Sequence, residues 1–153
     1  DAFELPNVRI GLGWNRGILP PPLPPLNEHF AAADHLFDPA CAGHTAPLLF
    51  VAFSAQGPGV QQWHAPCAAM RATGVEIDAL YLADPSNSFY LQDPEGLWEG
   101  LCHFGALLHR YIQHYTNVLM VGSSMGATAA LQHSRHASRL VAFAPRVDLT
   151  FSH

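Results

Sequence analysis

The residues best suited to chemistry are Gly122-Ser123-Ser124-Met125-Gly126, a G-x-S-x-G motif. The apolar run Asn117–Gly122 leads into this motif, and the alanine-rich stretch Gly126–His133 follows it. A serine on a sharp strand-to-helix turn exposes its Oγ as a nucleophile, and the N–H groups of the following helix can stabilise an oxyanion. The motif therefore predicts acyl-transfer chemistry at Ser124.

The elements that must position this serine can be read from the hydrophobic pattern. Short apolar runs, typical of buried parallel strands, occupy Leu48–Ser54, Glu76–Leu82, Asn117–Gly122 and Arg139–Ala144. Helical spacing or helix-forming residues lie between and after them, at Val60–Thr73, Glu95–Tyr115 and Gly126–His133. This alternation predicts an α/β fold with a doubly wound, mostly parallel sheet of about four strands.

The first 46 residues differ from the rest of the chain. They include Pro20–Pro25, which predicts an extended polyproline segment that acts as a stiff connector or strap, or as a ligand for an SH3-type domain. Val8–Gly13 suits an edge strand, and Asn27–Leu36 suits a short helix. We therefore expect an extended Pro-rich N-terminal arm over residues 1–46 and a core domain over residues 47–153.

With its flanking strand and helix, the G-x-S-x-G motif resembles the nucleophile elbow of the α/β-hydrolase superfamily. The resemblance covers about residues 47–150. It implies that Leu48–Ser54 and Asn117–Gly122 lie side by side where the strand order reverses, which is where ligands bind in such sheets. It also implies that the backbone N–H groups of Met125 and of Ala55 or Gln56 form the oxyanion hole.

The same resemblance implies a base and an acid after the nucleophile, in the order Ser, acid, His. Ser124, Asp148 and His153 have this order, but no predicted element fixes His153 at the end of the chain. Because the family has further strands at this point, the chain is expected to be a truncated member. His64 is another candidate base, whereas His133 and His136 are expected to point away from the serine.

A metal or another cofactor is not predicted. The ten histidines and three cysteines include no H-E-x-x-H motif and no C-x-x-C pair, and they form no Cys/His cluster with the spacing typical of zinc ligands. The cysteines are expected to be buried as small apolar residues. Asp84 and Asp93 stand among proline and asparagine residues, so turn formation explains them.

Charge and composition restrict the possible partners. Only 12% of the residues are charged, about half the usual share, which predicts that another protein covers part of the surface. The seven Lys and Arg residues are scattered, which argues against nucleic acid, and no apolar run approaches the ~18 residues of a membrane span. The chain begins at Asp1, so a processed or trimmed N-terminus is expected, and the compartment stays open, an organelle included.

Two functions are consistent with these observations. The first is a non-catalytic or vestigial hydrolase-like accessory subunit, with other protein subunits covering the Arg139–Ala144 edge or an adjacent face. The alternative is a serine hydrolase acting on an ester or thioester, with Ser124 as the nucleophile, as a possible fragment of a longer chain. An intact serine favours the alternative, and low charge with an uncovered final strand favours the first.

Overall fold

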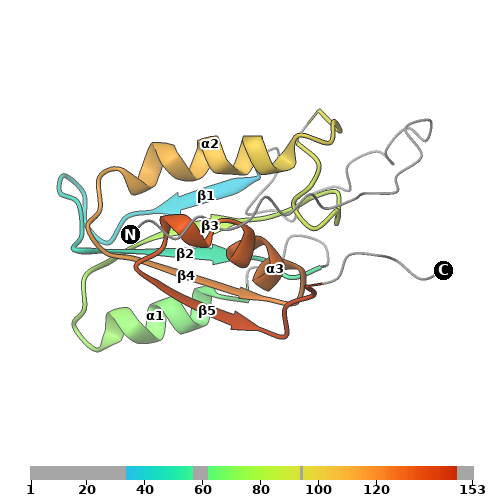
Figure 1. Ribbon diagram of the computed structural model, residues 1–153. Helices are drawn as coiled ribbons and strands as arrows, with labels where there is room; N and C mark the ends of the chain where they lie inside the picture. The colour runs from blue at the N-terminus through green and yellow to red at the C-terminus, as the bar shows by residue number, and fades with distance from the viewer. Residues whose placement is uncertain (1–33, 57–61, 94, 148–153) are drawn as a thin grey trace, which may run out of the picture.

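A computed structural model describes residues 34–56, 62–93 and 95–147, and the structural statements below concern these residues. They form an α/β fold in which helices cover both faces of one sheet (Figure 1). The strands are β1 (His35–Asp38), β2 (Leu48–Phe53), β3 (Ile77–Leu82), β4 (Val118–Ser123) and β5 (Arg139–Phe143). The helices are α1 (His64–Ala72), α2 (Gly100–Ile112), α3 (Met125–Gln132) and the short 3₁₀ helix η1 (Ser134–His136).

The strand order in the sheet is β1-β3-β2-β4-β5. Strands β2 to β5 are parallel, whereas β1 runs antiparallel to β3. The predicted α/β class is confirmed, and each of the four predicted strands forms close to its expected position. The expected number of strands is corrected to five, and the sheet is mixed because of β1.

Strand β1 was missed because its four half-buried residues lack a continuous apolar run. The predicted helix Asn27–Leu36 is wrong at residues 35 and 36, which belong to this strand. Residues 27–33 of that helix, the predicted strand Val8–Gly13 and the segment Pro20–Pro25 lie outside the described residues. Strand β1 also falls within the range assigned to the N-terminal arm.

Side chains of β2 alternate between two apolar layers, because successive residues of a strand face opposite sides of the sheet. Phe53 and its alternate neighbours pack with α2 and α3, including Phe104 and Met125. Phe50 and Ala52 face the other layer, where Cys67 of α1 is buried. Burial of Cys67 matches the sequence expectation, but Cys41 and Cys102 are exposed, contrary to it.

Strand β5 departs from the prediction of a strand buried on both faces. Leu140 packs against the α2–α3 layer. On the alternating positions, Val141 is 40% and Phe143 is 54% exposed. The reason is the position of β5 at one end of the described sheet, where α1 packs over β3 rather than over β5.

At the other end of the sheet, polar and aromatic contacts fasten β1 to α2. The carboxylate of Asp34 bonds to the rings of His35 and His103, and Phe37 stacks on Tyr111 of α2. Burial alone would raise the pKa of Asp34, but the hydrogen bonds and positive charge of the two histidines outweigh it and lower that pKa.

Within the described residues, no helix has the length and apolar character needed to cross a membrane.

A buried histidine directly follows α3 and lies near α2 and Phe53 of β2. His133 is 4% exposed, and its ring stacks on Phe53 with the centroids 6.0 Å apart. Its Nε2 atom is buried without a hydrogen-bond partner among the described residues. Burial, together with the nearby His136 and Arg135, lowers the pKa of His133 to about 4.

This histidine predicts loss of stability in mild acid. In the unfolded chain His133 takes up a proton near pH 6.5, but in the folded chain it does so only near pH 4. The free energy of unfolding should therefore fall as the pH drops through this window, by at most ~3 kcal/mol from this group. Urea unfolding at pH 7 and pH 4.5 should show a smaller drop for His133→Phe than for the parent.

His114→Gln is the matched control, because His114 is exposed. It should keep the parent's full acid dependence. Asp34 contributes its own loss of stability only at lower pH, below the ordinary pKa of an aspartate, so it does not obscure the comparison. Equal acid sensitivity of His133→Phe and the parent would contradict the assignment.

Candidate functional site

Ser124 occupies the sharp turn between β4 and α3. Its backbone has φ 52° and ψ −118°, a conformation usually taken by glycine, and the residue is exposed. The Ser124 N–H donates to the carbonyl of Phe143 at 2.9 Å, and its own carbonyl accepts from the N–H of Thr128 at 3.1 Å. The turn is therefore held from β5 on one side and from the first turn of α3 on the other.

The two glycines of the motif permit a close approach of three backbone segments. A Cβ on Gly126 would lie 2.3 Å from the carbonyl oxygen of Phe53 and 2.6 Å from that of Ser54. A Cβ on Gly122 would lie 2.2 Å from the carbonyl oxygen of Gly126. Side chains cannot be accommodated at these distances, so glycine at both positions is what lets α3 begin against the end of β2.

The predicted side-by-side placement of the two site strands is confirmed. Strands β2 and β4 are paired in parallel, with Phe53 opposite Gly122. Their carboxyl ends therefore carry Ala55 and Gln56 on one side and Ser124 and Met125 on the other. Ala55 is half-buried, Gln56 is exposed and Met125 is fully buried. The structure thus brings the serine and the candidate oxyanion residues to one edge of the sheet.

The chain leaving β2 is held by a buried tyrosine, Tyr90, which no sequence motif indicates. The hydroxyl of Tyr90 lies 3.1 Å from Ser54 Oγ and hydrogen-bonds to the carbonyls of Ser54 and Leu82 at 3.1 and 3.0 Å. Burial raises the pKa of Tyr90, and the charge of Asp84 adds to this, so the hydroxyl stays protonated and can donate. Tyr90 thereby positions the backbone just before Ala55.

Asp84 organises the loop that carries Tyr90. Its buried carboxylate accepts hydrogen bonds from the backbone N–H groups of Ser86, Ser88 and Tyr90 at 3.0, 2.7 and 2.7 Å, and from the hydroxyls of both serines. Asp93 likewise accepts from the N–H of Leu97 at 2.7 Å. The prediction that these two aspartates serve turn formation is confirmed. The sequence signal for the loop was present, but nothing in it indicated the long-range contact of Tyr90 with Ser54.

The candidate acid and base, Asp148 and His153, lie outside the described residues. The last described residue, Val147, directly precedes Asp148 in the sequence. After β5, Arg146 is fixed to α3 by Thr128, whose Oγ1 donates to the Arg146 carbonyl and accepts from the Arg146 N–H, both at 2.9 Å. The segment leading to Asp148 therefore leaves from beside the first turn of α3.

The other histidines considered for the site are placed by their own contacts. The ring of His64 packs edge-on against Tyr81 of β3, with the centroids 4.2 Å apart. Because β2 separates β3 from β4, this packing directs His64 to a strand that is not adjacent to that of Ser124. His133 is buried against Phe53 and His136 belongs to η1, beyond the end of α3. Those two positions agree with the expectation that they point away from the serine.

Chemically, this end of the sheet offers an exposed serine on a constrained backbone, beside the N-terminus of α3 and a loop held by buried hydrogen bonds. No protein-family model matches the sequence, and a search of curated proteins finds no significant match. The resemblance to the α/β-hydrolase superfamily therefore stays a prediction, supported by the motif and its setting.

The backbone of Ser124 predicts an unusual effect of glycine on stability. A non-glycine residue in this conformation costs on the order of 1–3 kcal/mol, which glycine avoids. Ser124→Gly should therefore raise the free energy of unfolding, by about 1 kcal/mol after the entropic cost of glycine is included. Denaturant unfolding followed by circular dichroism measures the change.

Ser123→Gly is the matched control, because Ser123 is the last residue of β4 and has no positive φ. Glycine there should lower the free energy of unfolding by roughly 0.5–1 kcal/mol. If both variants were destabilised to the same extent, the backbone of Ser124 would not be strained.

Proposed function

We propose that the protein is a serine hydrolase of the esterase or thioesterase type, with Ser124 as its nucleophile. The observation that carries the proposal is an exposed serine at φ 52° and ψ −118°, at the carboxyl end of a central strand and directly before a helix. Strained backbone conformations persist where the surrounding structure enforces them, and they cluster at active sites. A turn kept only for folding would be served better by glycine.

The proposed chemistry follows from the groups around the serine. Ser124 Oγ attacks the acyl carbonyl while a base accepts its proton, and the resulting oxyanion receives hydrogen bonds from the N–H of Met125 and of Ala55 or Gln56. The alcohol or thiol then leaves with a proton returned by the base. Water attacks the acyl-enzyme in the same way, releasing the acid and regenerating the serine.

For the base and its orienting acid, we propose His153 and Asp148. The hydrogen bonds between Thr128 and Arg146 support this proposal, because they hold Arg146 beside the first turn of α3. Asp148 follows Arg146 by two positions in the sequence. His64 is the less favoured base, because its ring packs on Tyr81. Asp84 is unsuited to the acid role, because its carboxylate is already engaged by the loop that it organises.

A fluorophosphonate probe tests the nucleophile directly, because it forms a bond only with an activated serine. The full chain should be labelled with one probe per molecule, and Ser124→Ala should abolish labelling. Ser123→Ala is the matched control, since it removes the neighbouring hydroxyl and should leave labelling intact. Intact-protein mass spectrometry measures the stoichiometry, and an unlabelled but folded parent chain would refute the catalytic proposal.

A second candidate, an accessory subunit of a larger assembly, is favoured by a different observation. Val141 and Phe143 of β5 are exposed, and Trp63 stacks on Phe143 with the ring centroids 5.9 Å apart. These three side chains form an apolar surface, named here the β5 patch, on and beside the last strand of the described sheet. Apolar groups gathered at a sheet edge are typical of a protein interface, so another subunit is the proposed occupant.

The β5 patch predicts that the chain expressed alone associates through it. Light scattering over a range of concentrations should give a mass above 16.6 kDa that rises with concentration. Phe143→Ser combined with Val141→Ser should shift the protein toward the monomer. Leu97→Ser is the control, because Leu97 is equally exposed but precedes α2. A concentration-independent monomer with a sharp thermal transition would contradict self-association through the β5 patch.

A further inference from the structure

Three metal-ligating side chains meet at the end of the sheet opposite Ser124. Cys41 and His44 lie in the connection between β1 and β2, and Glu76 directly precedes β3. One ligand atom from each, the thiol sulfur, a ring nitrogen and a carboxylate oxygen, lies within 4.8 Å of the other two. His44 Nε2 and Glu76 Oε2 are 3.3 Å apart. All three side chains are exposed, so an ion from solution can reach them.

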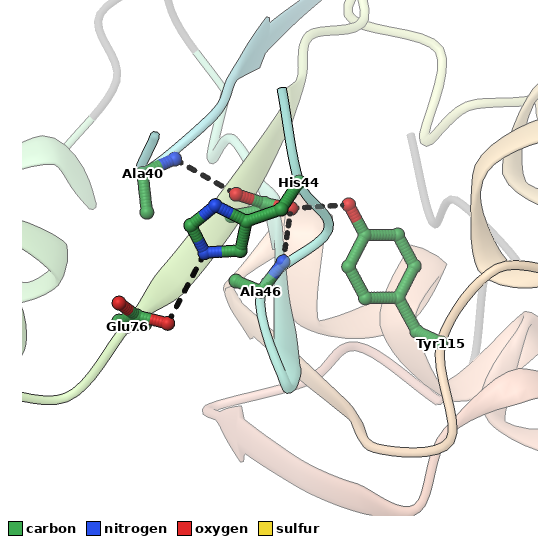
Figure 2. A network of polar contacts seen from close by, with 6 residues as sticks. Ala40, His44, Ala46, Glu76 and Tyr115 are labelled. Carbon is green, nitrogen blue, oxygen red and sulfur yellow. Dashed lines mark hydrogen bonds and ion pairs between the residues drawn. The ribbon is translucent and has the colours of Figure 1, made fainter. Parts of the chain in front are cut away.

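The backbone that carries these ligands is fixed by a buried carboxylate. Asp78, which is 1% exposed, accepts hydrogen bonds from the N–H groups of Ala40 and Ala46 at 2.7 and 3.0 Å. Tyr115 donates its hydroxyl to the same carboxylate at 2.6 Å. Figure 2 shows these donors converging on the carboxylate, with His44 and Glu76 beside them. The connection is thus held at both ends, so its ligands need not be gathered from a disordered chain.

We infer that Cys41, His44 and Glu76 form a binding site for a divalent transition-metal ion of the zinc class. A thiolate, an imidazole and a carboxylate are the ligands that zinc accepts in proteins. At bond lengths of roughly 2.0–2.3 Å, tetrahedral ligand atoms lie roughly 3.3–3.8 Å apart. The observed spacing therefore requires movements of about 1 Å or less, which exposed side chains make by small torsional changes.

The donor set also indicates what kind of site this is. Three protein ligands leave at least one coordination position for water, which is the arrangement of open zinc sites rather than of closed structural ones. Because a thiol must lose its proton to coordinate a metal, binding is coupled to proton release. A plain surface ion pair between His44 and Glu76 would explain their contact, but it gives no role to the sulfur beside them.

The site is distinct from the proposed hydrolase site. It lies at the amino ends of β2 and β3, whereas Ser124 follows the carboxyl end of β4, and these strands run in the same direction (Figure 1). A six-residue strand is ~20 Å long, so the two sites are separated by about the length of the sheet. Metal binding is therefore measurable whether or not Ser124 is active.

Cobalt(II) is the probe, because its coordination by a thiolate produces a ligand-to-metal absorption band. The full chain, kept reduced, should bind one equivalent and show this band, and zinc should displace the cobalt. Cys41→Ser should abolish the band. His44→Gln and Glu76→Gln should each weaken zinc affinity, measured by competition with a chromophoric chelator, by at least about tenfold.

Cys102→Ser and His114→Gln are the matched controls, because each removes an exposed residue of the same type elsewhere on the protein. Both should bind cobalt and zinc as the parent does. Circular dichroism of every variant verifies that it is folded. The inference is overturned if the folded parent gives no thiolate–cobalt band, if the band survives in Cys41→Ser, or if the controls lose affinity as much as the ligand variants.

Discussion

The close approach of α3 to the end of β2 is the constraint on which the rest of the structure depends. The backbone of Gly126 meets the carbonyls of Phe53 and Ser54 at distances that exclude any side chain. This contact holds the start of α3 against the end of β2, while the helix packs over β4 and β5, and the chain turns sharply from β4 into α3 at Ser124. The strained backbone of Ser124 persists because the surrounding hydrogen bonds and the buried residues of α3 hold it in this conformation.

Much of this arrangement could be predicted from the sequence, because its signals are local. The runs that form β2, β3 and β4 are continuously apolar, and G-x-S-x-G specifies a turn that only glycine can flank. Strand β1 could not be found in this way. Its residues are only half-buried, and what makes them a strand is pairing with β3, more than 30 positions away in the chain.

The candidate sites show the same division between local and long-range information. Ser124 was found from its motif, whereas the support of the adjoining loop by Tyr90 depends on contacts with Ser54 and Leu82 that no short pattern encodes. Cys41 and His44 are separated by two residues, and two possible ligands alone do not indicate a metal site. Glu76 joins them only because β2 and β3 are neighbours in the sheet. Folding, rather than motif, assembles that cluster.

The two outer strands of the described sheet differ in how readily a further strand could pair with them. Strand β1 is short, has Asp38 at its end in an ion pair with Arg71, and runs antiparallel to the rest, so it closes its side of the sheet. Strand β5 is parallel and, after Arg139, apolar, and within the described sheet its outer edge is unpaired. A strand added there, from this protein or another, would extend the parallel series and deliver its following loop to the edge that holds Ser124. New binding specificity can therefore be acquired at one side of the sheet without disturbing the other.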